Sequence, residues 1–211
     1  RTSISTNIRE RLDFSCALLD AKGTLIASAP HIPVHLGALG VCVRETIKSM
    51  EHGAWSIDES TPNSELHAPC PPQPGDTYIT NHPAFGGSHL PDVTLITPVF
   101  DDRQTLLGFV ANRAHHAEIG GITPGSMPAN ATCLVEEGVV IAPQHLVRAR
   151  ETRFDALAKL LSDAPYPTRN LADNLADLHA QLAANRLGVE RLRELAVTND
   201  VPAAMSAILD H

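Results

Sequence analysis

Two short stretches of the sequence combine histidine, carboxylate and paired glycine. Residues 86 to 94 read G-G-S-H-L-P-D-V-T, which places His89 and Asp92 three residues apart around a proline. Residues 113 to 121 read R-A-H-H-A-E-I-G-G, with two adjacent histidines and a nearby glutamate. Imidazole and carboxylate groups bind borderline divalent cations and also donate and accept protons. The two stretches are therefore candidates for parts of one site.

The apolar runs beside these stretches predict how they meet. The run at 93 to 100 starts just after Asp92, and the run at 106 to 112 ends just before His115. The intervening D-D-R-Q favours a turn, so the two runs are expected to pair as an antiparallel hairpin. In such a hairpin the start of the first strand lies beside the end of the second. We therefore expect His89, Asp92 and His115 to converge at one sheet edge.

Two imidazoles and one carboxylate suit a divalent metal such as Mn, Zn, Fe or Mg, and three protein ligands leave positions open for water or substrate. This is the composition of a catalytic metal site. His116 and Glu118 are then the candidate catalytic residues, and they could also support the ligands, because ligand groups usually have hydrogen-bonding partners of their own. The alternative is structural: His89 and Asp92 stabilise a turn, and the adjacent histidines only end a strand.

The remaining histidines and the absent motifs add context. Nucleotide binding by this chain is unsupported, because the sequence has no G-x-x-x-x-G-K-[ST] loop and no G-x-G-x-x-G after a predicted strand.

Junctions beside Gly or Pro hold polar side chains still while leaving them accessible. Six of the 11 histidines lie at such predicted junctions: His31, His35, His82, His89, His115 and His116.

Composition limits the class of protein. The chain has 211 residues, 43% of them hydrophobic, which is enough for one substantial core. Its formal net charge of -8 and scattered basic residues argue against a nucleic-acid or anionic-membrane partner. The sequence contains neither a signal-like start nor an apolar run of about 18 residues, and its four cysteines have no C-x-x-C spacing. We therefore expect a cytoplasmic protein with reduced thiols.

Local patterns predict an α+β fold with antiparallel hairpins, N-terminal helices and a C-terminal helical hairpin. We expect a metal-site domain at 1–148 and a helical segment at 149–211 for packing or subunit contact. The predicted elements are a helix at 5–12, a hairpin within 13–28, a helix at 37–51, a long loop at 52–76, strands near 76–80, 93–100 and 106–114, a hairpin or bent strand at 132–142, and helices at 150–163 and 168–197.

The last of these helices carries leucines at alternating steps of four and three residues, and Asn185 occupies the one polar position in that stripe. This pattern favours an amphipathic helix packed on its own chain. The alternative is a helix hairpin that projects toward a partner subunit, in which a buried Asn185 would fix the register.

Taken together, the ordered motifs resemble the N-terminal part of the hydantoinase B/oxoprolinase family. The resemblance covers nearly the whole chain from about residue 3. It rests on N-I-R-E-R-L-D-F-S-C-A-L-L-D, H-I-P-V-H-L-G, G-D-T-Y-I-T-N-H-P-A-F-G-G-S-H-L-P-D-V-T, R-A-H-H-A-E-I-G-G-I-T-P-G-S-M-P and R-N-L-A-D-N-L-A-D-L-H-A-Q-L-A-A-N.

This resemblance implies an ATP-dependent system that acts on cyclic amides such as hydantoins or 5-oxoproline. An A-type partner binds ATP and phosphorylates the substrate's carbonyl oxygen, and the B-type component completes the hydrolysis at a metal site. By matching motifs, His89, Asp92 and His115 carry over as metal ligands, with His116 as the alternative to His115. The rival functions are a component of an acetone- or acetophenone-type ketone carboxylase, and a non-catalytic assembly module.

The sequence departs from the family pattern in three respects. His82 stands in N-H-P where the family usually has N-D-P, and Glu118 stands where Asp is usual. The first change could alter the local charge or add a ligand, and the second changes side-chain reach. The chain is also much shorter than family B components, so we expect a fragment or one part of a split protein.

Overall fold

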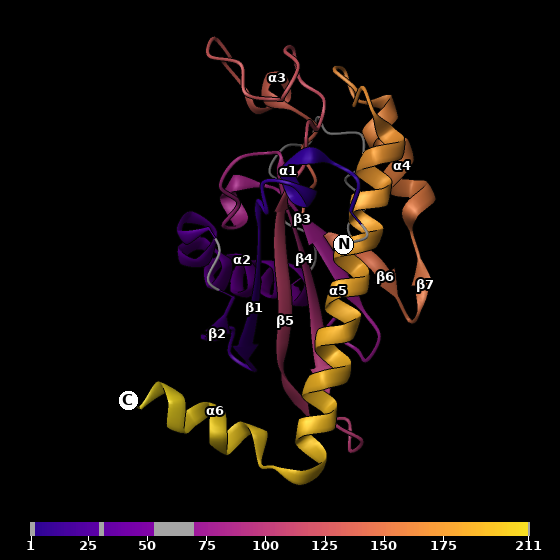
Figure 1. Ribbon diagram of the computed structural model, residues 1–211. Coiled ribbons are helices and arrows are strands. Elements are labelled where there is room, and N and C mark those ends of the chain that lie inside the picture. Colours follow the sequence, from indigo (N-terminus) through magenta and orange to yellow (C-terminus); the bar gives the residue numbers. More distant parts are fainter. Residues whose placement is uncertain (1–2, 30–31, 53–69, 211) are drawn as a thin grey trace.

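A seven-stranded antiparallel sheet forms the centre of the computed structural model, which describes residues 3–29, 32–52 and 70–210 (Figure 1). The strand order is β2-β1-β5-β4-β3-β6-β7, which places the β4–β5 hairpin near the middle. The strands are β1 (Phe14–Asp20), β2 (Leu25–Ser28), β3 (Thr77–Thr80), β4 (Asp92–Phe100), β5 (Leu106–His115), β6 (Gln144–Arg148) and β7 (Glu151–Thr152).

Helices cover both faces of this sheet, because successive side chains on a strand point to opposite sides. Ile96 of β4 packs in one hydrophobic cluster with α2 (Pro33–His52). Its neighbour Leu95 packs in another cluster with α4 (Phe154–Asp163) and α5 (Leu171–Thr198). We call these sides of the sheet the α2 face and the α5 face.

Short helices complete the described chain. They are α1 (Thr6–Arg9), the 3-10 turn η1 (Pro83–Phe85), α3 (Leu134–Glu137) and α6 (Val201–Leu209). In Figure 1 the long α5 runs along the sheet, and α6 turns away from its lower end. No helix in the described ranges is long and apolar enough to cross a membrane.

The predicted α+β fold class is confirmed, and so are the two hairpins expected from turn chemistry. β1 pairs with β2, and β4 pairs with β5 in a register that sets Asp92 opposite His115. The long helix predicted at 168–197 corresponds to α5. Asn185 in this helix donates to the carbonyl oxygen of Leu95 at 3.2 Å, so α5 packs on its own sheet, as the favoured interpretation held.

The hairpin or bent strand predicted at 132–142 is wrong. Residues 134–137 form the short helix α3, in which the Glu136 carboxylate accepts the backbone N–H of Thr132 at 2.6 Å. Such a reach back to the preceding backbone favours a helical turn. The strand of this region is β6, in a stretch after Pro143 for which no element was predicted, and it forms because β3 offers an edge for pairing.

Other boundaries differ by a few residues. α2 starts at Pro33 rather than at 37, since proline suits the first turn of a helix. The helix expected from 150 starts at Phe154, because residues 151–152 pair with β6. α6 was not predicted. Most of the predicted loop at 52–76 lies outside the described residues. The domain boundary at 148/149 stays a prediction, although α4 and α5 share a hydrophobic cluster with the sheet.

Candidate metal centre

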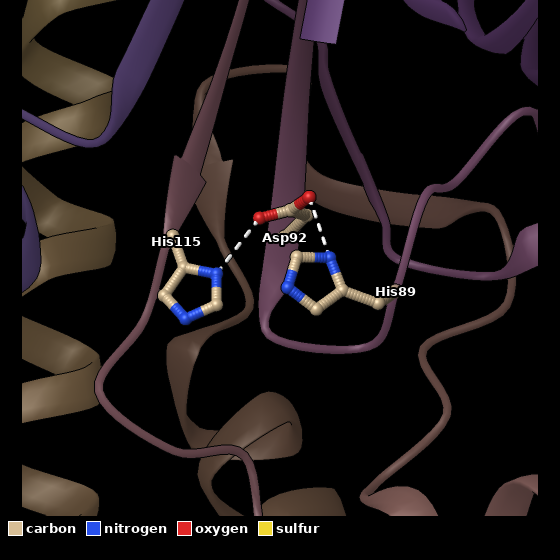
Figure 2. Close-up of side chains that lie close together, drawn as sticks. All are labelled: His89, Asp92 and His115. Carbon is tan, nitrogen blue, oxygen red and sulfur yellow. Dashed lines mark hydrogen bonds and ion pairs between the residues drawn. The ribbon is translucent and has the colours of Figure 1, made fainter. Parts of the chain in front are cut away.

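The register of the central hairpin brings the three candidate ligands together. Asp92 begins β4 and His115 ends β5 directly opposite it, while His89 lies three residues before Asp92. One potential ligand atom from each residue lies within 4.8 Å of the other two. Figure 2 shows both imidazoles turned toward the carboxylate. We call these three residues the triad.

A tight loop positions the side chains of His89 and Asp92. Gly86 ends η1 in the left-handed region at a φ of 78°, and a Cβ there would meet the backbone nitrogen of Cys42 in α2 at 2.6 Å. Only glycine allows this close approach. The N–H of Asp92 then donates to the carbonyl oxygen of His89 at 2.9 Å, which closes a turn and puts both side chains on one side.

The three residues of the triad differ in how far they are buried. Asp92 is fully buried, whereas the side chains of His89 and His115 are 32% and 15% exposed. The Nδ1 atoms of the two imidazoles lie 2.7 Å and 3.1 Å from separate carboxylate oxygens, and the two rings are 4.8 Å apart. The two histidines are therefore accessible to a cation from solvent, and the buried carboxylate of Asp92 lies on their inner side.

Asp92 is held in its charged form. Burial raises the pKa of this carboxyl, but hydrogen bonds from His115, His35, His89 and Ser88 outweigh burial and hold the pKa far below its usual range. Hydrogen bonds to the charged form of a group favour that form. Asp92 therefore carries a full negative charge at neutral pH.

His89 couples this charge to proton binding. Its hydrogen bond to Asp92 raises the pKa of the imidazole, against the opposing effect of burial. A ligand histidine must lose the proton from its coordinating nitrogen before it binds a metal. A proton and a cation would therefore compete for His89 at pH values above the ordinary range for histidine.

The carboxylate also has partners that the sequence analysis did not assign to the site. Ser88 Oγ donates to Asp92 Oδ2 at 2.7 Å, and His35 Nε2 lies 3.3 Å from the same oxygen. The fully buried Arg113 donates to Ser88 Oγ at 3.2 Å and to Thr94 Oγ1 at 2.8 Å. The H-I-P-V-H-L-G stretch signalled His35, but nothing local indicated which residue it contacts.

His116 lies on the other face from His115, although the two are adjacent. It is fully buried, and its Nδ1 and Nε2 lie 2.9 Å and 3.0 Å from the side-chain oxygens of Asn174 and Gln181 in α5. Gln181 Nε2 donates in turn to Asn112 Oδ1 at 2.8 Å. The structure thus brings His115, and not His116, to the triad.

Glu118 also turns toward α5. Its carboxylate accepts the backbone N–H groups of Gly120, Arg169 and Asn170 and the hydroxyl of Thr168. Burial raises the pKa of Glu118, but these hydrogen bonds prevail and hold the pKa below its usual value. A carboxylate beside the first N–H groups of a helix also complements the helix dipole. Glu118 therefore anchors the start of α5.

His82 lies apart from the triad. His82 Nδ1 accepts the N–H of Ala84 at 3.1 Å, so the departure from N-D-P caps η1, and the ring stacks edge-on against Phe85. Burial lowers the pKa of His82. His31 lies outside the described residues.

A mostly apolar pocket of about 430 Å³ lies on the α5 face, between α1, β1, β5 and α5. It is lined by Cys16, Asn112 and Ala114, among others. These residues alternate with the ones that point to α2, so the pocket and the triad occupy opposite faces. This pocket does not border the candidate ligands.

These observations define a layered α+β protein with a histidine–carboxylate cluster suited to a divalent cation at one sheet edge. The chain belongs to the hydantoinase B/oxoprolinase family, because the model of that family matches residues 1–211. It is 44% identical over 207 residues to a 5-oxoprolinase of Saccharomyces cerevisiae. The match covers 95% of this chain and 15% of that relative, so the chain spans under a fifth of the relative's length.

Solved structures share the fold. The ATP-dependent caprolactamase from Pseudomonas jessenii superposes with a TM-score of 0.73 at 27% identity, over 94% of this chain and 30% of that one. An acetone carboxylase, in a nucleotide-free structure, also gives 0.73 at 17% identity, over 95% and 24% of the two chains. At that identity, the likeness to the carboxylase concerns the fold alone.

Proposed function

We propose that this chain is the metal-site part of a B-type component in an ATP-dependent cyclic-amide hydrolase. The observation that carries the proposal is the convergence of His89, Asp92 and His115 at one sheet edge. In the proposed reaction, an A-type partner binds ATP and phosphorylates the carbonyl oxygen of the substrate, and hydrolysis is completed at the triad.

The triad fits a divalent cation on chemical grounds. It offers two imidazoles and one ionised carboxylate, the set that Mn, Zn and Fe accept, and its three members leave other coordination positions open. A cation bound there supplies Lewis acidity, which polarises a carbonyl or phosphoryl oxygen and lowers the pKa of a water molecule.

Residues of this chain have two proposed roles, which are to bind the cation and to position its ligands. Asp92 contributes the negative charge, and His89 and His115 contribute nitrogen ligands once their Nδ1 protons have left. Because both ring nitrogens of His116 and both oxygens of Glu118 have partners, we assign these two residues a positioning role. They fasten the segment after β5 to α5 and so fix the end of the strand that carries His115.

A cyclic amide is the proposed substrate class. The relative at 44% identity is named for 5-oxoproline, and the caprolactamase fold neighbour for another ring amide. An amide carbonyl is a poor electrophile, and phosphorylating its oxygen creates a leaving group, which explains the proposed need for ATP on the partner. Ketone carboxylation is the second candidate, and it is favoured only by the shared fold of acetone carboxylase.

Metal analysis combined with two assays tests the proposal. The purified protein should hold about one Mn²⁺, Zn²⁺ or Fe²⁺ per chain, and His89→Ala and Asp92→Ala should hold none. With its ATP-binding partner, it should hydrolyse 5-oxoproline or a hydantoin. A wild type unable to acquire any of these metals would sink the metal proposal. Consumption of bicarbonate with a ketone, without amide hydrolysis, would favour the carboxylase.

A further inference from the structure

We propose that His35 is a positioning residue for the metal centre, which holds Asp92 so that one carboxylate oxygen faces the cation. The inference rests on the proposed metal site and adds a residue outside the triad. His35 lies 54 residues before His89 in the sequence. It belongs to α2 and reaches Asp92 from the helix that covers this face of the sheet.

The contacts of the imidazole fix its orientation. His35 is 2% exposed, its Nε2 lies 3.3 Å from Asp92 Oδ2, and its Nδ1 lies 3.2 Å from the hydroxyl of Ser15 in β1. An ionised carboxylate only accepts hydrogen bonds, so Nε2 is the nitrogen that donates to it. Ser15 then holds the other edge of the ring.

The two oxygens of Asp92 differ in their partners. Oδ2 has two partners outside the triad, His35 and Ser88, in addition to His89. The polar contact of Oδ1 is with His115, a triad member. Apart from the triad histidines, Oδ2 therefore has two hydrogen-bond donors, and Oδ1 has none among the described residues. The geometry therefore points to Oδ1 as the oxygen that meets the cation.

α2 is placed tightly enough to define this contact. Its residue Cys42 lies against Gly86, so closely that a Cβ at Gly86 would overlap the helix backbone. Cys42 and Leu39 are fully buried in the cluster that α2 shares with the sheet. The same packing that holds the loop before His89 thus also brings His35 to the carboxylate.

The test compares metal affinity in four proteins: wild type, His35→Leu, His35→Gln and a matched control, His145→Leu. Titration calorimetry with Mn²⁺ and with Zn²⁺ gives each Kd, and thermal unfolding of the metal-free proteins reports folding. Removing an outer partner of a metal ligand typically weakens binding by about 10- to 100-fold, which is the loss expected for His35→Leu. His35→Gln, whose amide N–H has a similar reach, should recover most of the affinity.

His145 is a buried histidine of β6 outside the centre, so His145→Leu should bind metal as the wild type does. Wild-type affinity in His35→Leu would overturn the inference and leave the metal site standing. Equal losses in His35→Leu and His35→Gln would also overturn it, since packing alone would explain them. If His35→Leu does not fold, the metal titration of Ser15→Ala takes its place. Weaker metal binding by Ser15→Ala supports the inference, and unchanged metal binding refutes it. A wild type that binds neither ion would refute the proposed function itself.

Discussion

Two polar clusters lie on opposite faces of the same hairpin, and they differ in how far their histidines are buried. On the α2 face, Asp92 gathers His89 and His115, which are both partly exposed. On the α5 face, His116 is fully buried between the carboxamides of Asn174 and Gln181. The first cluster has partly exposed imidazoles that suit the proposed cation, whereas both ring nitrogens of His116 are already paired inside the protein.

The difference shows that chemical type and sequence neighbourhood do not decide the role of a histidine. An exposed imidazole beside a carboxylate can give up its proton and still leave every buried group paired. An imidazole between two buried amides cannot be turned away without leaving those amides unsatisfied, at a cost of about 1 to 3 kcal/mol for each group. The adjacent histidines are thus suited to different roles: the proposed metal binding for His115 and packing for His116.

The largest expected effect comes from removing the charge of the first cluster. Asp92→Ala should abolish metal binding, with a loss beyond the roughly 100-fold limit seen for outer partners, because it deletes a ligand and the charge that attracts the cation. Activity with the ATP-binding partner should vanish with it. Calorimetry with Mn²⁺ and a turnover assay check both. Stoichiometric metal in Asp92→Ala would contradict the assignment of the triad.

The adjacent histidines should separate binding from stability. His116→Ala should lower the free energy of unfolding by about 3 kcal/mol, because it strands the side-chain oxygens of Asn174 and Gln181 in the interior. His115→Ala should cost only about 1 kcal/mol but lose the metal. Urea unfolding and metal titration of both variants provide the comparison. The opposite pattern would show that His116 is the ligand.

Glu118→Gln should destabilise the protein by about 2 kcal/mol near neutral pH, because its carboxylate accepts several buried hydrogen bonds. The folded-state pKa of Glu118 is lowered. Its contribution is therefore complete above the ordinary glutamate pKa of about 4.3 and is lost as the pH falls through the lower folded value.

Unfolding measured from pH 7 to pH 3 checks this sign. The stability difference between wild type and Glu118→Gln should stay constant down to about pH 5 and shrink below about pH 4. A difference that grows in acid would mean that the folded protein raises the pKa of Glu118.

The smallest effect is expected for an exposed ion pair that belongs to neither cluster, which serves as a control. Asp102 in the β4–β5 turn pairs with Arg193 of α5 at 2.6 Å, but their side chains are 84% and 52% exposed. Asp102→Ala should therefore change the free energy of unfolding by less than about 1 kcal/mol and leave metal affinity unchanged. The same titrations measure it. A larger loss would show that charge removal alone, anywhere on the hairpin, accounts for the effects above.

Sequence reasoning anticipated the first cluster better than the second. The convergence of Asp92 and His115 follows from one hairpin, because two apolar runs and a short turn determine which residues are opposite each other. Asn174, Gln181 and Asn185 recur at steps of seven and four, a spacing that puts them on one helix face, but the leucine stripe drew attention first. Their burial depends on contacts with residues at least 58 positions away in the sequence.

By itself, the sequence determined the α+β class, the central hairpin and the approach of His89 and Asp92 to the His115–His116 pair, since each depends on local turn chemistry and on the two-residue period of a strand. Only the tertiary structure decided which of the adjacent histidines joins Asp92, and that His35 and Ser88 support it. The physical reason is that a strand's period separates two faces without saying which helix will cover each one. The packing of α2 and α5 against their hydrophobic clusters makes that choice.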